Sequence, residues 1–319
     1  MLILGLQGSP RKKGNTQKFL SIFLEAAEEL GANTISIDVP RKNISPCLAC
    51  GNCERKGFCV IDDDMQEIYP LLRKADMVVM ATPIFFYGPT AQMKTLIDRS
   101  QALWARRYTY KLADPGQRWR RGFMLSLGAT KGKNLFEGIS LEAKYFFDAV
   151  GATFAGSLTF KRIENPGDIE KHPTALSEAK GKAIELVKPY LDRKKVLFVC
   201  RENACRSQIA SAFAQYYLGD RIEVESAGSA PAQDINPVME EAMKEKGIDM
   251  AYREPKSTDD IKNFGAPDLI ITMGCEDACP VFPGAKVEDW EFPDPAGQAI
   301  DFMRRIRDEI KERVVSIDV

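Results

Sequence analysis

Short runs of apolar residues alternate with longer amphipathic segments along the first 191 residues. Runs of four to eight apolar residues bounded by turn signals indicate strands, and apolar residues that recur every three or four positions indicate helices. Regular alternation of the two is typical of a parallel sheet covered by helices. The predicted strands lie near residues 1–7, 34–39, 77–82, 122–127 and 153–160. The predicted helices lie near residues 15–31, 64–74, 91–105, 134–150 and 173–191.

The pattern restarts after the charged stretch 192–195. Strands are predicted near residues 196–200, 222–226 and 268–273, and helices near residues 207–218, 236–247 and 298–315. We therefore predict an α/β protein with two doubly wound parallel-sheet domains, residues 1–192 and residues 195–319. Five strands in the first domain suit a flavodoxin-like sheet, whose ligand lies at the carboxyl ends of the strands.

Length and composition agree with two soluble domains. The chain has 319 residues, 45 % of them hydrophobic, and a formal net charge of −1. This charge gives no electrostatic indication of nucleic acid or membrane binding, and no apolar run approaches the roughly 18–20 residues that cross a bilayer. We expect a cytoplasmic protein, in which the three groups of cysteines indicate metal or redox chemistry rather than structural disulfides. A single histidine, His172, argues against Ser–His and Cys–His catalysis.

Two loops of the first domain have the composition of a nucleotide site. The loop 8–16, GSPRKKGNT, offers hydroxyls, backbone N–H groups and cations at a helix N-terminus. That combination suits a phosphate monoester, although an ordinary turn with helix-capping residues would explain the same loop. The loop 82–89, TPIFFYGP, carries aromatic residues that can flank a flat ring such as isoalloxazine. Ser126 and Gly128, at the end of the fourth strand, would add a third wall to this site.

Together with the following QMKTLIDR, these segments resemble the flavodoxin-like FMN reductases, and the resemblance covers roughly residues 1–190. It implies that the domain binds FMN. The phosphate would lie near Ser9, Arg11, Asn15 and Thr16. The ring would lie near Pro83, Ile84, Phe85, Phe86, Tyr87 and Gly88.

Four cysteines lie within thirteen residues, at Cys47, Cys50, Cys53 and Cys59. Four thiolates match the ligand count of a 4Fe–4S cluster, and Gly51 and Gly57 allow the sharp turns of a compact loop. The segment resembles the cysteine motif of iron–sulfur flavoproteins, which implies a 4Fe–4S cluster in addition to FMN, and a homo-oligomer formed through the flavin domain. A structural zinc site and a metal-free thiol loop remain open alternatives.

The second domain opens with a cysteine loop of different character. Cys200 follows the strand VLFV, and Arg206 closes the loop at the start of a helix. Backbone N–H groups and a guanidinium favour the thiolate form and cradle a tetrahedral oxyanion, which Arg206 can contact in bidentate fashion. Cys200 is thus the predicted nucleophile, and Asp294 is the candidate general acid, although an Asp-Pro turn is the alternative. The other predicted cradle residues are Arg201, Glu202, Asn203, Ala204, Cys205 and Ser207.

Residues 195–315 resemble the low-molecular-weight tyrosine phosphatase superfamily, and more closely its thioredoxin-coupled arsenate reductases. The helix begins Arg-Ser-Gln where phosphatases usually have Arg-Ser-Pro, and Cys275 and Cys279 supply the pair that a disulfide relay needs. Several reductases space this pair more widely, which leaves the relay geometry in doubt. The resemblance implies that Cys200 attacks arsenate, that Cys275 attacks Cys200 with release of arsenite, and that Cys279 resolves the resulting disulfide.

The order of the domains suggests how the Cys275–Cys279 disulfide is reduced. We expect the FMN domain to supply the electrons, drawn from NAD(P)H or ferredoxin, with thioredoxin or glutaredoxin as alternative reductants. Two other functions stay open. One is a phosphatase under redox control by the cysteine pair, and the other is a non-catalytic electron-transfer or redox-sensing protein whose second domain binds oxyanions.

Overall fold

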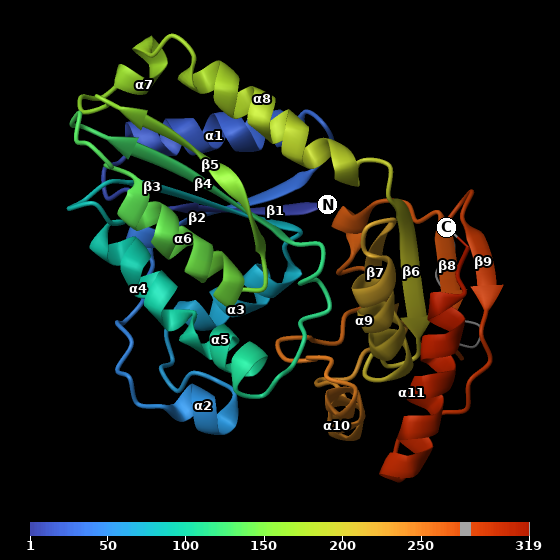
Figure 1. The fold of residues 1–319 in the computed structure, drawn as a ribbon. Helices are drawn as coiled ribbons and strands as arrows, with labels where there is room; N and C mark the ends of the chain where they lie inside the picture. Colours follow the sequence, from blue (N-terminus) through green and yellow to red (C-terminus); the bar gives the residue numbers. More distant parts are fainter. Residues whose placement is uncertain (275–281, 319) are drawn as a thin grey trace. The chain divides into compact units, whose positions relative to one another are not determined.

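The computed structural model describes residues 1–274 and 282–318 (Figure 1). The chain divides into two compact units. The first comprises Met1–Lys111 and Gln117–Leu191, and the second comprises Asp192–Val319 together with Leu112–Gly116. No helix among the described residues is long and apolar enough to span a membrane.

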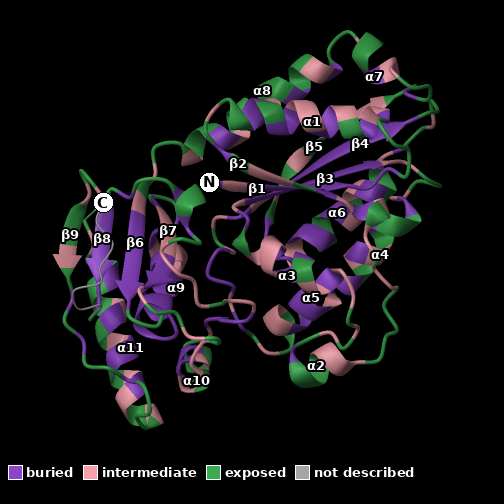
Figure 2. Cartoon of the chain, turned by 180° about the vertical axis from the view of Figure 1, so that it is seen from behind, coloured by how far each residue is buried: buried purple, intermediate pink, exposed green. Residues whose placement is uncertain are grey.

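The first unit is built on a five-stranded parallel sheet with the strand order β2-β1-β3-β4-β5. Its central strands are buried on both faces, as expected where helices cover a parallel sheet (Figure 2). The strands are β1 (Leu2–Gln7), β2 (Asn33–Asp38), β3 (Met77–Pro83), β4 (Arg121–Gly128) and β5 (Thr153–Lys161).

Helices cover both faces of this sheet, as Figure 1 shows. One face carries α1 (Asn15–Glu28), α7 (Asp168–Lys171) and α8 (Ala175–Val187). The opposite face carries α3 (Met65–Lys74), α4 (Ala91–Arg99), α5 (Gln101–Tyr108) and α6 (Glu137–Ala149). The short α2 (Asn52–Lys56) lies within the four-cysteine segment and contacts α5. Two 3-10 turns, η1 (Val39–Arg41) and η2 (Lys188–Tyr190), complete the unit.

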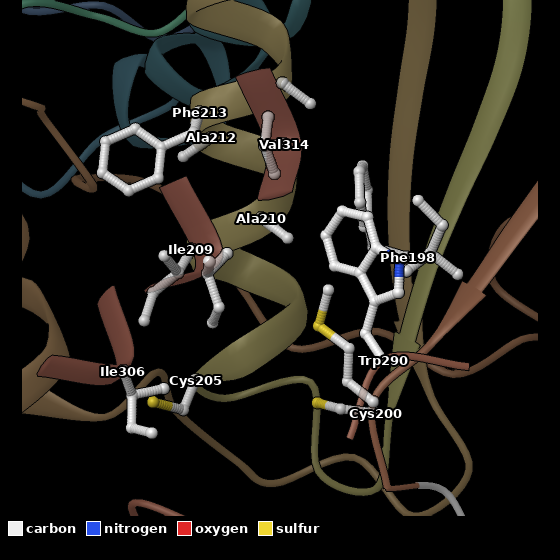
Figure 3. Packing of buried hydrophobic residues seen from close by; sticks show 14 of the residues in the cluster. Phe198, Cys200, Cys205, Ile209, Ala210, Ala212, Phe213, Trp290, Ile306 and Val314 are labelled. Carbon is white, nitrogen blue, oxygen red and sulfur yellow. The ribbon is translucent and has the colours of Figure 1, made fainter. Parts of the chain in front are cut away.

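The second unit has a four-stranded parallel sheet with the strand order β7-β6-β8-β9. Helix α9 is buried on almost every side between Arg206 and Ala214, because it packs on both the sheet and α11 (Figure 3). The elements are β6 (Lys194–Cys200), α9 (Arg206–Leu218), β7 (Ile222–Gly228), α10 (Pro237–Glu245), η3 (Lys262–Phe264), β8 (Leu269–Thr272), β9 (Lys286–Asp289) and α11 (Ile300–Val315).

The predicted fold class is confirmed, since both units are parallel-sheet α/β structures. The short helices α2 and α7 were not predicted, and two further details differ from the predicted elements. The single helix expected over residues 91–105 is two helices that meet at Ser100, and the second sheet gains the edge strand β9. The sequence of β9, KVED, is mostly exposed and carries no apolar alternation, which is why periodicity did not indicate it.

Candidate functional sites

The loop after β1 leads into α1 with its helix N-terminus uncapped by any side chain. Gly14 is the N-cap residue and makes no side-chain hydrogen bond, so the first-turn N–H groups of α1 keep their capacity for an anion. Ser9 and Thr16 are buried beside this terminus, and the Ser9 hydroxyl accepts a hydrogen bond from the Arg11 N–H at 3.3 Å. The loop therefore combines free backbone donors with two hydroxyl side chains.

Arg11 and Asn15 tie this loop to the segment that follows β5. The Arg11 guanidinium donates to the Glu164 carbonyl at 2.7 Å. The Asn15 amide donates to the Asn165 carbonyl at 2.8 Å and accepts from the Gly167 N–H at 3.1 Å. Both side chains thus hold the loop 8–16 against the segment that follows β5, a role that the sequence pattern did not indicate.

A tight hairpin displays three aromatic side chains after β3. Phe85 and Gly88 exchange backbone hydrogen bonds of 2.9 and 3.0 Å, so that Phe86 and Tyr87 form a two-residue turn. Their φ angles are 49° and 65°, in the left-handed region that bulky residues rarely adopt. Phe85, Phe86 and Tyr87 are all exposed. Backbone strain of this kind clusters at functional sites.

The other residues predicted to contact the ring lie closer to the sheet. Pro83, Ile84 and Gly88 are half-buried at the base of the hairpin. Ser126 is fully buried and donates its hydroxyl to the Thr82 carbonyl at 2.8 Å, and Gly128 is packed under Leu135. Ser126 and Gly128 therefore support the floor of the site rather than its surface.

The four predicted ligand cysteines lie on one surface loop and none forms a disulfide. Cys47 and Cys50 are exposed, whereas Cys53 and Cys59 are half-buried, and burial raises the pKa of Cys53. Among the described residues, no three His, Cys, Asp or Glu side chains are arranged as metal ligands. The donor set fits a 4Fe–4S cluster or zinc in number and chemical kind.

Cys200 ends β6, and two polar groups lie beside its sulfur. The Asn203 N–H donates to Sγ at 3.2 Å, and the Ser207 hydroxyl lies 3.0 Å from the same sulfur. Asn203 is fully buried and has a φ of 49°, which turns its N–H toward Cys200. Its amide donates to the Ser207 hydroxyl at 2.8 Å and accepts from the Lys256 N–H at 2.8 Å. Asn203 and Ser207, two of the predicted cradle residues, therefore lie beside the thiol.

Arg206 and Asp294 meet at this cradle, although they are 88 positions apart in the sequence. An Arg206 Nη2 atom lies 3.5 Å from the Asp294 carboxylate, whose side chain is more than half exposed. Gly274, the last residue described before the cysteine pair, also lies beside Arg206, because a Cβ built on it would come within 2.7 Å of Nη1. Cys275 and Cys279 lie outside the described residues.

The other cradle residues divide into buried and exposed positions. Ala204 and Cys205 are buried, whereas Arg201 and Glu202 are exposed. The Cys205 sulfur points toward α11, where it lies 3.3 Å from the Met303 sulfur (Figure 3).

The single histidine, His172, accepts hydrogen bonds from the N–H groups of Thr174 and Ala175 at the start of α8.

Three residues that position these loops had no recognisable signal in the sequence. Arg99 and Asp63 form a buried ion pair at the base of the four-cysteine loop. Gly228 allows β7 to approach the cradle, since a Cβ there would lie 2.7 Å from the Arg201 carbonyl. An arginine at a helix end and a glycine at a strand end are too common to be identified without their spatial neighbours.

Family models match both halves of the chain. The model of NADPH-dependent FMN reductases matches residues 1–160, and that of low molecular weight phosphotyrosine protein phosphatases matches residues 195–317. The chain is 42 % identical over 131 residues to an iron-sulfur flavoprotein of Methanosarcina thermophila, covering 41 % of this chain and 65 % of that protein. Across three such flavoproteins, the chain spans 45 to 65 % of the relative's length.

The second half matches arsenate reductases. The chain is 41 % identical over 131 residues to arsenate reductase 2 of Staphylococcus haemolyticus, covering 40 % of this chain and 97 % of that protein. Among solved structures, a thioredoxin-dependent arsenate reductase of Corynebacterium glutamicum is 37 % identical, with a TM-score of 0.32, covering 45 % of this chain and 72 % of that chain.

Proposed function

Because the chain belongs to the NADPH-dependent FMN reductases over residues 1–160 and to the arsenate reductases over its second half, we propose that it is a bifunctional oxidoreductase. Its second unit reduces arsenate to arsenite, and its first unit supplies electrons through FMN. Two contacts support this proposal: the Asn203 N–H donates to the Cys200 sulfur, and Arg206, which ends the same loop, lies 3.5 Å from the Asp294 carboxylate.

The cradle provides each group that the first chemical step requires. Arsenate is held by the loop N–H groups and by the Arg206 guanidinium, whose burial strengthens the interaction. The Cys200 thiolate attacks arsenic and displaces one oxygen. Asp294 protonates the departing oxygen, which its exposed carboxyl beside Arg206 can reach. The Asn203 N–H and the Ser207 hydroxyl orient the Cys200 sulfur for this attack.

Reduction follows by thiol exchange. The Cys275 thiolate attacks the Cys200 sulfur, the sulfur–arsenic bond breaks, and its electron pair stays on arsenic, so that arsenite leaves. Two thiols have then been oxidised to a disulfide while As(V) has become As(III). Cys279 attacks this disulfide and leaves a Cys275–Cys279 bond with Cys200 free.

Three serine variants separate these steps. Cys200→Ser should abolish both arsenate reduction and phosphate-ester hydrolysis, because a serine hydroxyl stays protonated in the same cradle. Cys275→Ser should block arsenite release but leave ester hydrolysis, and Cys279→Ser should trap a Cys200–Cys275 disulfide after one turnover. Equal multiple-turnover reduction by wild type and Cys275→Ser would exclude the relay. Ester hydrolysis without arsenate reduction in the wild type would favour a phosphatase, and oxyanion binding without turnover would favour a sensor.

The first unit is proposed to bind FMN at the carboxyl edge of its sheet. The uncapped N-terminus of α1 and the buried hydroxyls of Ser9 and Thr16 suit the phosphate, and the strained Phe86–Tyr87 turn suits the ring. Bound FMN would accept hydride and release single electrons. The full chain incubated with FMN should carry a yellow chromophore that denaturation releases as FMN. A chain that stays colourless in excess FMN would exclude this site.

The proposed electron source is NAD(P)H or ferredoxin acting on the first unit. In the presence of arsenate, the full chain with NAD(P)H or reduced ferredoxin should then produce arsenite without added thioredoxin or glutaredoxin. The control is the Cys200→Ser variant, which should still oxidise the donor with an artificial acceptor but should produce no arsenite. A strict requirement for thioredoxin or glutaredoxin would show that the second unit is reduced from outside the chain.

The four cysteines of residues 47–59 are proposed to hold a 4Fe–4S cluster. Their number and their lack of disulfides fit this group, and Cys47, Cys50, Cys53 and Cys59 would be its ligands. The cluster would supply single-electron transfer. Anaerobic protein should contain about four irons and matching sulfide per chain if the cluster is intact. Zinc as the dominant metal, or no metal under strict anaerobiosis, would assign the loop to one of its two alternatives.

A homo-oligomer is proposed through the helical face of the first unit. A groove of about 450 Å³ runs between α4, α5 and α6, and Trp104, Leu141 and Tyr145 line it while remaining substantially exposed. Single apolar residues on a surface are ordinary, but exposed apolar side chains gathered in one groove favour an interaction surface. Leu141→Glu should reduce the mass measured by light scattering, whereas Ile184→Glu on α8 should leave it unchanged. Equal masses for wild type and Leu141→Glu would exclude this face.

A further inference from the structure

Arg99 and Asp63 form an ion pair that is almost fully removed from solvent in the first unit. Their side chains are 0 and 3 % exposed, and the shortest nitrogen–oxygen distance between them is 2.6 Å. The second guanidinium nitrogen lies 3.0 Å from the other carboxylate oxygen, so the pairing is bidentate. Arg99 ends α4, whereas Asp63 lies just past the four-cysteine segment.

The pair holds both ends of the four-cysteine loop together. On the side before the cysteines, Arg99 donates to the Ser45 carbonyl at 2.9 Å and Asp63 accepts the Ser45 N–H at 2.8 Å. On the side after the cysteines, Arg99 donates to the Ile61 carbonyl at 3.3 Å and Asp63 accepts the Met65 N–H at 3.1 Å. Ser45 and Ile61 enclose all four thiols of the loop.

From this arrangement we propose that the Arg99–Asp63 pair is a positioning latch that closes the four-cysteine loop before it receives its cluster. The inference rests on the proposed cluster function of the loop. Joining the ends of a flexible segment has an entropic cost, which an assembling cluster would otherwise have to meet. The Arg99–Asp63 pair closes the loop when the unit folds, because the pair forms through α4 and needs no metal. The entropy of loop closure is then lost before the cluster assembles.

Further contacts restrain the loop between its ends. The Arg106 guanidinium of α5 donates to the Gly57 carbonyl at 3.1 Å and stacks on the Phe58 ring at 4.6 Å. Asn52 donates to the Phe58 carbonyl at 3.0 Å. These contacts fix the stretch between Cys53 and Cys59. The Arg55 guanidinium donates to the Cys50 carbonyl at 3.0 Å, and the Cys47 and Cys50 side chains remain exposed.

A purely structural role would predict a different pattern of effects. Buried ion pairs contribute little net stability compared with apolar packing, and here the Arg99 Nε atom has no hydrogen-bond partner in the described structure. The pair instead fixes the positions of the two loop ends, because its hydrogen-bond partners belong to them. The role can therefore be separated from general stability by comparison with another buried arginine of the same unit.

Arg120 provides that matched control. It is 1 % exposed and donates to the Ala75 and Val150 carbonyls at 2.8 and 3.0 Å, away from the cysteine loop. Arg99→Lys and Arg120→Lys both keep the charge and lose the fork of donors. The full-length variants are compared by amide hydrogen exchange of residues 45–65 in metal-free protein. They are also compared by iron content and visible absorption after anaerobic treatment with ferrous iron and sulfide.

We expect Arg99→Lys to accelerate exchange in residues 45–65 by about tenfold or more, the effect of losing charge-assisted hydrogen bonds, and to lose most of its bound iron. Arg120→Lys should leave both readouts near wild type. If Arg99→Lys retained iron at the wild-type level, or if both variants lost equal amounts, the positioning role of the Arg99–Asp63 pair would be refuted. The cluster assignment would not be affected. A wild type that binds no iron would instead overturn the cluster, and with it the positioning role.

Discussion

Asn203 offers the sharpest test of how the oxyanion cradle is built. Its backbone N–H faces the Cys200 sulfur, and its φ of 49° lies in the left-handed region. Its side chain donates to the Ser207 hydroxyl and accepts from Gln208 and from the Lys256 N–H. Two replacements separate these contributions, because Asn203→Gly removes the side chain but tolerates the φ angle, whereas Asn203→Ala removes the side chain and strains the backbone.

The sizes of the two effects follow from the contacts. In either variant the part-buried Lys256 N–H loses its 2.8 Å acceptor, which costs about 1–3 kcal/mol. Gln208 keeps a second bond to the Glu254 carbonyl at 3.0 Å, so its loss is smaller. Alanine at a left-handed φ adds about 1–2 kcal/mol that glycine does not incur. We therefore expect Asn203→Gly to lose about 1–3 kcal/mol of stability and Asn203→Ala about 2–5 kcal/mol.

Urea unfolding of the second unit measures this difference. Trp290 lies in the core of that unit, and its fluorescence can be followed alone after Trp104 and Trp119 are replaced by phenylalanine. The alkylation rate of Cys200 by iodoacetamide reports whether the Asn203 N–H still faces the sulfur, and it should change more in Asn203→Ala than in Asn203→Gly. Equal stabilities for wild type and both variants would refute this account of the cradle. An alanine variant as stable as the glycine variant would refute the backbone contribution.

Three further predictions concern single contacts. Gly228→Ala should weaken phosphate inhibition of ester hydrolysis by tenfold or more, because its Cβ would lie 2.7 Å from the Arg201 carbonyl. FMN binding should be unchanged in this variant, and unchanged phosphate inhibition would contradict the close approach. Gly138→Ala should weaken FMN binding in a fluorescence titration, since its Cβ would lie 2.7 Å from the Tyr87 carbonyl and displace the aromatic hairpin. Burial opposes ionisation of Asp63, but hydrogen bonds from Arg99, Ser45 and Met65 outweigh it and lower its pKa. The contribution of Asp63 to stability is therefore complete above its unfolded pKa of about 3.9, and it is lost as pH falls through the folded pKa. When the urea unfolding midpoint is plotted against pH, Asp63→Asn should reduce the fall of the midpoint at acid pH.

The sheets and the chemistry-bearing loops could be predicted because their signals are local. A buried strand such as β3 is a continuous apolar run, and the spacing of Cys200 and Arg206 marks a loop that enters a helix. Strand β9 was not predicted from the sequence because an exposed edge strand needs no apolar face. The break at Ser100 escaped because the apolar period continues through it, and the interruption depends on how α4 and α5 pack.

The supports of the loops could not be predicted because they depend on distant partners. Arg99 and Asp63 are 36 positions apart, and Asn203 and Lys256 are 53 apart. In the sequence each is one polar residue among many. The positive φ angles of Phe86 and Tyr87 were also hidden, since aromatic residues are unfavourable in that conformation and no local rule selects them.

In both units, buried polar side chains fix the shape of a loop that carries thiols. A loop that presents thiols to a ligand cannot bury much apolar surface of its own, so packing alone does not fix its shape. A buried ion pair at Arg99 and Asp63 fixes the cysteine loop through hydrogen bonds to its backbone ends. A buried amide at Asn203 fixes the cradle through the Ser207 hydroxyl and the Lys256 N–H. Such groups are costly to bury unless their partners are in place. The loop geometry is therefore coupled to folding of its unit, and loss of one partner should appear first as local disorder at the thiols.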